Sequence, residues 1–152
     1  MSDIRTGMPL LARHEGEWEG VYIYIDADGK EVDRHNSHLT CKFPDGGEFD
    51  YYQINRYSWS DGRSEEHHFP AKYRDGRIWW DTERITGWAA DVGLDNDKRT
   101  TMLTWTRKDM PNHYLYEMIQ LSPCGTKRAR TWHWFKDDEL YQRTIIKERR
   151  VK

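Results

Sequence analysis

Clusters of turn-forming residues recur along the chain at short intervals, and this punctuation limits the fold more than any other feature of the sequence. The segments DADG, PDGG, SDG, RDG, LDNDK, KDMPN, SPCGT and KDDE are each rich in Asp, Gly, Asn or Pro. These residues tolerate or impose the backbone angles of tight hairpin turns. Short segments at such spacing, with no long helical pattern between them, predict an antiparallel β-sandwich or a closed barrel.

The segments between these turns are the candidate strands, and they cover residues 18–25, 33–43, 48–59, 63–69, 77–82, 99–107, 113–121, 127–135 and 139–149. Strands that follow one another through short turns favour an up-and-down barrel, because closure removes exposed edges. The Trp-Ala-Ala-Asp segment after Gly87 adds either a strand or a bulge, so we expect eight to ten strands. Residues 7–14 are expected to form a short helix, and residues 1–152 a single all-β domain.

The first candidate strand, GEWEGVYIYIDADG, alternates in its side chains. Successive residues of a strand point to opposite faces, so one face carries Trp18, Gly20, Tyr22 and Tyr24. The other face carries Val21, Ile23 and Ile25. The alternation alone leaves two arrangements open: the aliphatic face inside with the phenols on a wet surface, or the reverse.

The composition indicates a folded domain with an aromatic interior. The chain contains 8 Trp, 9 Tyr and 4 Phe, although its mean hydropathy is -1.05; disordered chains are usually poor in aromatic residues. With 24 basic and 26 acidic residues interspersed, no electrostatic case exists for a nucleic-acid partner. No apolar run approaches the ~20 residues of a membrane span, and the N-terminus lacks a secretory signal. We therefore expect a cytoplasmic protein with no membrane partner.

The opening and the ending of the chain resemble known families. A short helix followed by Gly16-x-Trp18-x-Gly20 resembles the calycin group, which includes lipocalins, fatty-acid-binding proteins and nitrobindins. The ending RARTWHWFKDDELYQR, residues 128–143, resembles a lipocalin-like family that is similar to phycobilin lyases. The resemblance spans nearly the whole chain and implies a barrel with a small-molecule cavity. In calycins the Trp of the opening motif lies inside, which implies that Tyr22 and Tyr24 face inward as well.

The Tyr-x-Tyr pair is also similar to that of phenolic acid decarboxylases, which are small cofactor-free barrel enzymes. In those enzymes two tyrosines and an Arg hold the substrate while a Glu handles the proton. Tyr22 and Tyr24 match the tyrosine pair, and Glu117 with Arg130 or Arg143 completes the set. The rest of the chain departs from that family, so the similarity is one of chemistry only.

Glu117 lies among apolar and aromatic neighbours in HYLYEMI. An ionised carboxylate in such surroundings is unfavourable unless it is paired. Glu117 is therefore either the structural partner of an Arg or a general acid or base with a raised pKa. His38 and His133 are further catalytic candidates, because an unperturbed imidazole titrates near neutral pH.

Aromatic and basic residues in the middle of strands are candidates for ligand contact. One face of the strand 127–135 carries both Arg130 and Trp132. This alternation suits either a cation–π ladder on the outside of a barrel or, inside it, a clamp for an aromatic ligand with an anionic group. One of the adjacent Trp79 and Trp80 must face inward. The residues that we expect to bind ligand are Trp80, Trp105, Arg130, Arg143 and Tyr51.

Seven histidines raise the question of a metal site. His67 and His68 are adjacent, and His35 and His38 are three residues apart, so each pair falls on opposite faces of a strand. Because no pair has the His-x-His spacing of a metal site, we expect no metal and no cofactor. Haem held by a single His, as in nitrobindins, is the alternative.

Together these features predict a barrel that binds a small aromatic or hydrophobic ligand bearing a polar group. The density of Tyr, His, Glu and Arg on strands favours a cofactor-independent lyase or isomerase. The alternative is a non-catalytic carrier of a small molecule, a chromophore or haem. The outward aliphatic residues of the first strand further indicate a homodimer.

Overall fold

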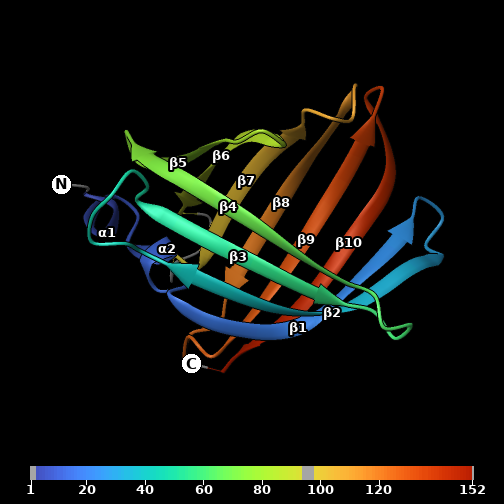
Figure 1. Cartoon of the computed structure of the whole chain (residues 1–152), viewed down its shortest axis with the longest axis horizontal. Coiled ribbons are helices and arrows are strands. Elements are labelled where there is room, and N and C mark those ends of the chain that lie inside the picture. Colours follow the sequence, from blue (N-terminus) through green and yellow to red (C-terminus); the bar gives the residue numbers. More distant parts are fainter. Residues whose placement is uncertain (1–2, 94–97, 152) are drawn as a thin grey trace.

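The computed structural model describes residues 3–93 and 98–151, and these form a closed antiparallel barrel of ten strands with two short helices at one end (Figure 1). The helices are α1 (Ile4–Gly7) and α2 (Pro9–Ala12). The strands are β1 (Gly16–Asp26), β2 (Glu31–Lys42), β3 (Tyr51–Ser58), β4 (Ser64–Arg74), β5 (Arg77–Asp81), β6 (Ile85–Val92), β7 (Thr100–Arg107), β8 (His113–Leu121), β9 (Lys127–Lys136) and β10 (Glu139–Arg150).

Each strand pairs with the next along the chain, and β1 closes the barrel against β10. The predicted up-and-down barrel is therefore confirmed. The Trp-Ala-Ala-Asp segment lies in a full strand, β6, rather than in a bulge. The turn expected at residues 94–98 falls mostly outside the described residues, which omit 94–97. In the DADG turn, Gly29 has a φ of 92° and donates its N–H to the Asp26 carbonyl at 3.0 Å.

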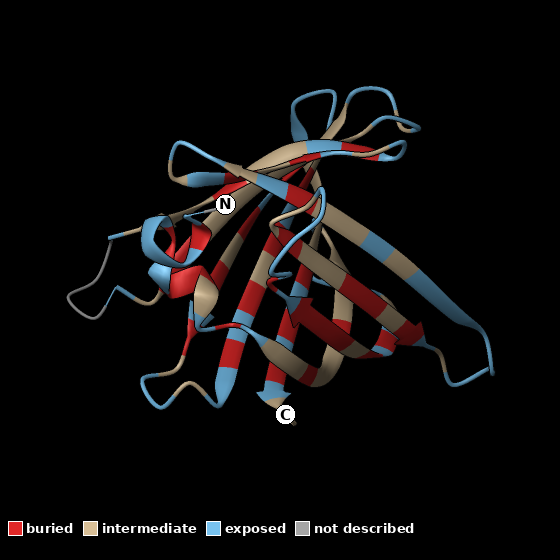
Figure 2. Ribbon diagram, turned by 60° about the vertical axis from the view of Figure 1, so that its left-hand side comes forward, coloured by how far each residue is buried: buried red, intermediate tan, exposed pale blue. Residues whose placement is uncertain are grey.

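The phenol-bearing face of β1 lies inside the barrel, as the resemblance implied. Trp18 and Tyr22 are fully buried, whereas Ile23 lies beside Ile145 of β10, which is 42% exposed on the outside. Figure 2 shows the same alternation of buried and exposed positions along the other strands. The aliphatic face of β1 therefore does not form the core.

The helices close one end of the barrel. The backbone N–H groups of Leu10 and Leu11 in α2 donate to Asp91 Oδ2 at 3.0 and 3.1 Å, and Thr101 Oγ1 donates to Asp91 Oδ1 at 2.8 Å. Asp91 lies near the end of β6 and Thr101 near the start of β7, so the opposite ends of these strands remain for a cavity. Among the described residues, no helix is long and apolar enough to cross a membrane.

Candidate ligand-binding cavity

A cavity of about 480 Å³ occupies the barrel at the end away from the helices. This volume lies in the range of small-molecule sites in proteins. Strands β5 to β9 supply an apolar wall that includes Trp80, Ile85, Leu103, Trp105, Ile119, Trp132 and Trp134. Strands β2 to β4 supply a polar wall that includes Asp33, His35, Gln53, Asn55, Tyr57, Glu65 and His67. The cavity is therefore two-sided.

Three indoles pack together in the apolar wall. Trp105 meets Trp132 and Trp134 edge to face, with ring centroids 6.1 and 5.9 Å apart, which is a favourable geometry for aromatic rings. Gly87 faces Trp105 and Trp80 from the strand between them. A Cβ at Gly87 would lie 2.5 Å from Trp105 Cβ and would meet the Thr104 carbonyl oxygen. Only glycine leaves room for this wall.

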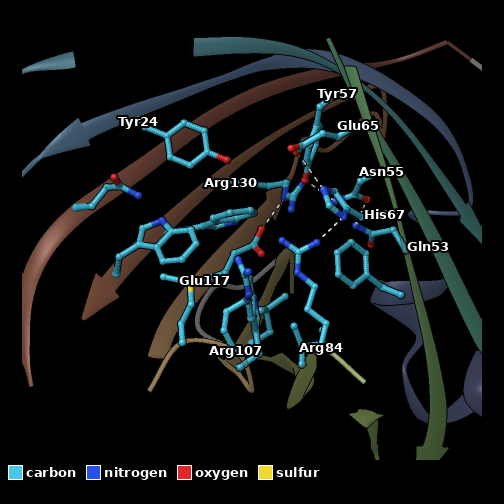
Figure 3. A pocket seen from close by; sticks show the side chains of 18 of the residues that line it. Tyr24, Gln53, Asn55, Tyr57, Glu65, His67, Arg84, Arg107, Glu117 and Arg130 are labelled. Carbon is cyan, nitrogen blue, oxygen red and sulfur yellow. Dashed lines mark hydrogen bonds and ion pairs between the residues drawn. The ribbon is translucent and has the colours of Figure 1, made fainter. Parts of the chain in front are cut away.

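The polar wall is ordered by a ladder of hydrogen bonds along β3, part of which is visible in Figure 3. Tyr51 donates its hydroxyl to Gln53 Oε1 at 2.7 Å, and Gln53 Nε2 donates to Asn55 Oδ1 at 2.8 Å. Asn55 Nδ2 then donates to the Tyr57 hydroxyl oxygen at 2.8 Å. Each member is two residues from the next, so period two places all four on the inner face. The sequence prediction missed the last three, although YYQINRY shows the polar alternation.

The mouth of the cavity is crossed by a contact between Arg84 and His67 (Figure 3). Among the described strands, β4 pairs with β5 only through residues 72–74, so residues 64–71 have a strand neighbour on one side only. On the side of β4 that lacks a strand neighbour, Arg84 Nη1 donates to His67 Nδ1 at 2.7 Å. His67 therefore carries its proton on Nε2 and donates it to Glu65 at 3.2 Å.

A buried network of charges forms the floor. Arg130 Nε donates to Glu117 Oε2 at 2.5 Å, and Arg130 Nη1 donates to the Tyr22 hydroxyl at 2.8 Å. Glu148 accepts from Arg128 Nε at 2.7 Å and from Arg130 Nη1 at 3.4 Å. The two guanidinium groups and two carboxylates balance in charge, as burial requires.

The network sets the ionisation of its members. Burial opposes the charge of Glu148, but the guanidinium groups of Arg128 and Arg130 outweigh it and hold the pKa of this carboxyl below its ordinary value. Burial raises the pKa of the Tyr22 hydroxyl well above its ordinary value. Gly20 leaves the space for Glu148, since a Cβ there would lie 2.7 Å from Glu148 Cγ.

Tyr24 and His35 form a hydrogen-bonded pair in the cavity. The Tyr24 hydroxyl lies 3.3 Å from His35 Nε2, and His35 Nδ1 lies 3.2 Å from the Asn36 carbonyl oxygen. A carbonyl only accepts, so Nδ1 carries the proton and Nε2 accepts from Tyr24. Burial lowers the pKa of His35 and raises that of Tyr24. At neutral pH the pair is a neutral imidazole and a protonated phenol.

Five of the predicted site residues line the cavity: Tyr24, Glu117, Trp80, Trp105 and Arg130. Two others need correction, because they lie beneath the cavity rather than on its wall. The Tyr22 hydroxyl is occupied by Arg130, and the Tyr51 hydroxyl by Gln53. Both tyrosines face inward, and only their depth differs from the prediction.

The placement of His38, His133 and Arg143 at the site is also corrected, since all three point away from the cavity. His38 contacts Glu17 Oε1 at 3.0 Å on the outer surface. Arg143 pairs in register with His133, which is exposed. Their neighbours Trp132 and Trp134 face inward, so the alternation of β9 turns His133 outward. The predicted opposite orientation of His35 and His38 is confirmed.

Metal ligands do not gather in the part of the chain that the structure describes. No group of three or more His, Cys, Asp or Glu side chains there could hold a metal ion. The two cysteines are free thiols, with Cys41 buried and Cys124 exposed.

No family model matches this chain, and no curated protein matches it. Solved structures do share its fold. An S-type phycobiliprotein lyase from Guillardia theta has a TM-score of 0.73 at 14% identity, over 95% of this chain and 92% of that one. Rv2717c from M. tuberculosis has a TM-score of 0.65 at 11% identity, over 96% and 98% of the two chains.

A protein of unknown function from the DUF3598 family of Nostoc punctiforme has a TM-score of 0.63 at 16% identity. The alignment covers 93% of this chain and 49% of that one, so this chain spans about half the length of that protein. At these identities the likeness shows the fold alone. The predicted resemblance to a calycin-like barrel is confirmed at that level.

Proposed function

We propose that this protein binds a small, flat aromatic or conjugated molecule with polar substituents inside the barrel. The two-sided cavity carries the proposal: a ring system packs on the indoles of β5 to β9, and its polar edge meets the hydrogen-bonding wall of β2 to β4. A plain acyl chain would exclude water from the polar wall and offer it no hydrogen bond in return, which is unfavourable. The ligand class is therefore aromatic with polar groups.

Prodan, a neutral naphthyl ketone whose emission shifts to the blue in an apolar site, tests this proposal. We expect saturable binding that other naphthalene derivatives displace and that dodecanoate displaces poorly. Trp105→Leu should weaken binding by about tenfold, because it removes an aromatic contact together with its buried area. Trp79→Leu is the matched control, since Trp79 lies outside the cavity under the guanidinium of Arg74. Absence of saturable binding, or equal losses in both variants, would contradict the proposal.

The second candidate is an acid–base enzyme, a cofactor-independent lyase or isomerase, and the Tyr24–His35 pair favours it. Tyr24 would donate a hydrogen bond to a ligand oxygen while the neutral His35 removes a proton from an adjacent carbon. Glu117 serves this role less well, because Arg130 holds its carboxylate. The Guillardia theta neighbour is named a lyase, which adds a candidate reaction class, although fold does not determine function.

Exchange of the methyl hydrogens of 2-acetylnaphthalene in D₂O tests the enzyme candidate without a known substrate. Removing a positioned base typically lowers the rate by about 10²–10⁴. We expect exchange above the buffer rate in the wild-type protein, and its loss in Tyr24→Phe and His35→Gln while prodan still binds. Exchange at the buffer rate in the wild-type protein would contradict the enzyme candidate and favour a non-catalytic carrier.

We also propose that the outer face of β1 and β10 forms a homodimer contact. Ile145 is 42% exposed and pairs with Ile23. Light scattering should show a dimer that Ile145→Lys dissociates, whereas Val32→Lys, at an exposed position of β2, should leave the dimer intact. A wild-type monomer refutes this contact.

A further inference from the structure

Two indole N–H groups in the cavity wall have no hydrogen-bond acceptor among the described residues. They belong to Trp80 and Trp132, and both nitrogen atoms are buried. Both side chains line the cavity and are only 7% and 6% exposed. A third indole in the same wall is satisfied, because Trp134 Nε1 donates to Thr144 Oγ1 at 2.8 Å.

A buried donor without an acceptor is unfavourable by about 1–3 kcal/mol, and buried Trp N–H groups usually find a partner. Trp132 packs against the rings of Trp105 and Trp134, with centroids 6.1 and 5.7 Å away. The Arg130 guanidinium lies 5.7 Å from its ring centroid, but a guanidinium offers donors and no acceptor. Across the sheet, Trp80 faces Gly87, which has no side chain. Because both side chains line the cavity, a molecule seated there is a candidate source of the acceptor.

The charges around the cavity indicate which kind of acceptor fits. The lining includes three guanidinium groups, of Arg84, Arg107 and Arg130, and three carboxylates, of Asp33, Glu65 and Glu117. Arg130 is occupied by Glu117 at 2.5 Å, and Arg107 by Asp109 at 2.8 and 2.6 Å. The lining thus has no excess positive charge to hold an anion, which favours a neutral oxygen.

We propose that Trp80 and Trp132 determine specificity by donating to two neutral carbonyl-type oxygens of the ligand, of the ketone, amide or lactam class. The inference rests on the proposed binding function and narrows its ligand. Because three strands separate β5 from β9 in the barrel, the two oxygens belong to different parts of the molecule. The ligand is then an extended aromatic or conjugated compound with carbonyl groups at separate positions.

The test uses 2,6-diacetylnaphthalene and its hydrocarbon isostere 2,6-diisopropenylnaphthalene, with affinities measured by displacement of prodan. The isostere keeps the shape and lacks the acceptors. Each of Trp80→Phe and Trp132→Phe should lower the preference for the diketone over the hydrocarbon by about two- to tenfold, the value of one neutral hydrogen bond. Trp79→Phe should leave that preference unchanged, because Trp79 lies outside the cavity and its N–H donates to the Arg74 carbonyl at 3.2 Å.

The indole N–H resonances of the wild-type protein provide a readout that is independent of the variants' folding. We expect the diketone to move the Trp80 and Trp132 resonances downfield and to leave that of Trp134 in place, whereas the hydrocarbon moves none downfield. If both compounds bind without these shifts or with an unchanged preference, the donor assignment is overturned while the binding function stands. If neither compound binds, both proposals fail.

Discussion

Replacing Glu148 by Gln should destabilise the barrel strongly. Glu148 accepts hydrogen bonds from both Arg128 and Arg130, and its side chain is fully buried. Without its charge, two buried guanidinium groups face a single carboxylate, that of Glu117. Removing one partner of a buried ion pair typically costs about 3–5 kcal/mol, a large share of the about 5–15 kcal/mol that stabilises a domain.

Urea unfolding followed by tryptophan fluorescence measures this loss. With an m-value of about 1–3 kcal/mol/M, the midpoint should fall by at least about 1 M in Glu148→Gln. Glu19→Gln is the control, because its pair with Arg149 is on the surface, with the two side chains 43% and 68% exposed; such pairs contribute about 0–1 kcal/mol. Similar midpoints for the two variants would refute the assigned role of the network.

The pH dependence gives a second check on Glu148. Its pKa is lowered in the folded state, where Arg128 and Arg130 outweigh burial. The stability that it contributes is therefore fully present above the unfolded carboxyl pKa of about 4.3 and is lost as pH falls through the lower folded value. The difference in unfolding free energy between the wild type and Glu148→Gln should be constant from pH 7 to about 5 and should shrink in stronger acid.

Three further predictions concern other parts of the barrel. Burial and the charge of Arg128 hold the pKa of His14 well below its ordinary value, so the unfolding free energy should fall by up to about 1.4 kcal/mol per pH unit below about pH 6.5. His14→Gln should flatten this pH dependence in urea titrations, and an unchanged slope would contradict the assignment. Gly87→Ala should lower the melting temperature, because the added Cβ would meet Thr104 and Trp105, whereas Gly93→Ala should not, because nothing lies within 4 Å of a Cβ there. Equal melting temperatures for the two variants would refute the close approach at Gly87. Arg84→Gln should speed release of prodan in stopped-flow experiments, because Arg84 spans the mouth to His67; an unaltered release rate argues against such a latch.

The sequence by itself determined most of the strands and which residues of the first strand share a face, whereas the resemblance to calycins implied which face lies inside. Turn residues and period-two alternation are local properties, so they can be recognised in a short segment without the rest of the chain. β6 was harder to assign because ITGWAADV carries apolar residues on both faces. The same alternation could have excluded His133, since it shares its strand with the inward-facing Trp132 and Trp134.

The tertiary structure decided depth along the barrel and the partner of each buried polar group. Tyr22 and Tyr24 lie on the same face, yet one is locked by Arg130 of β9 and the other reaches the cavity. Glu117 and Arg130 lie on the neighbouring strands β8 and β9, and the register of that pair brings their side chains together. Alternation specifies a face, whereas depth and partner follow from the register between strands that are distant in sequence, which exists only once β1 has closed on β10.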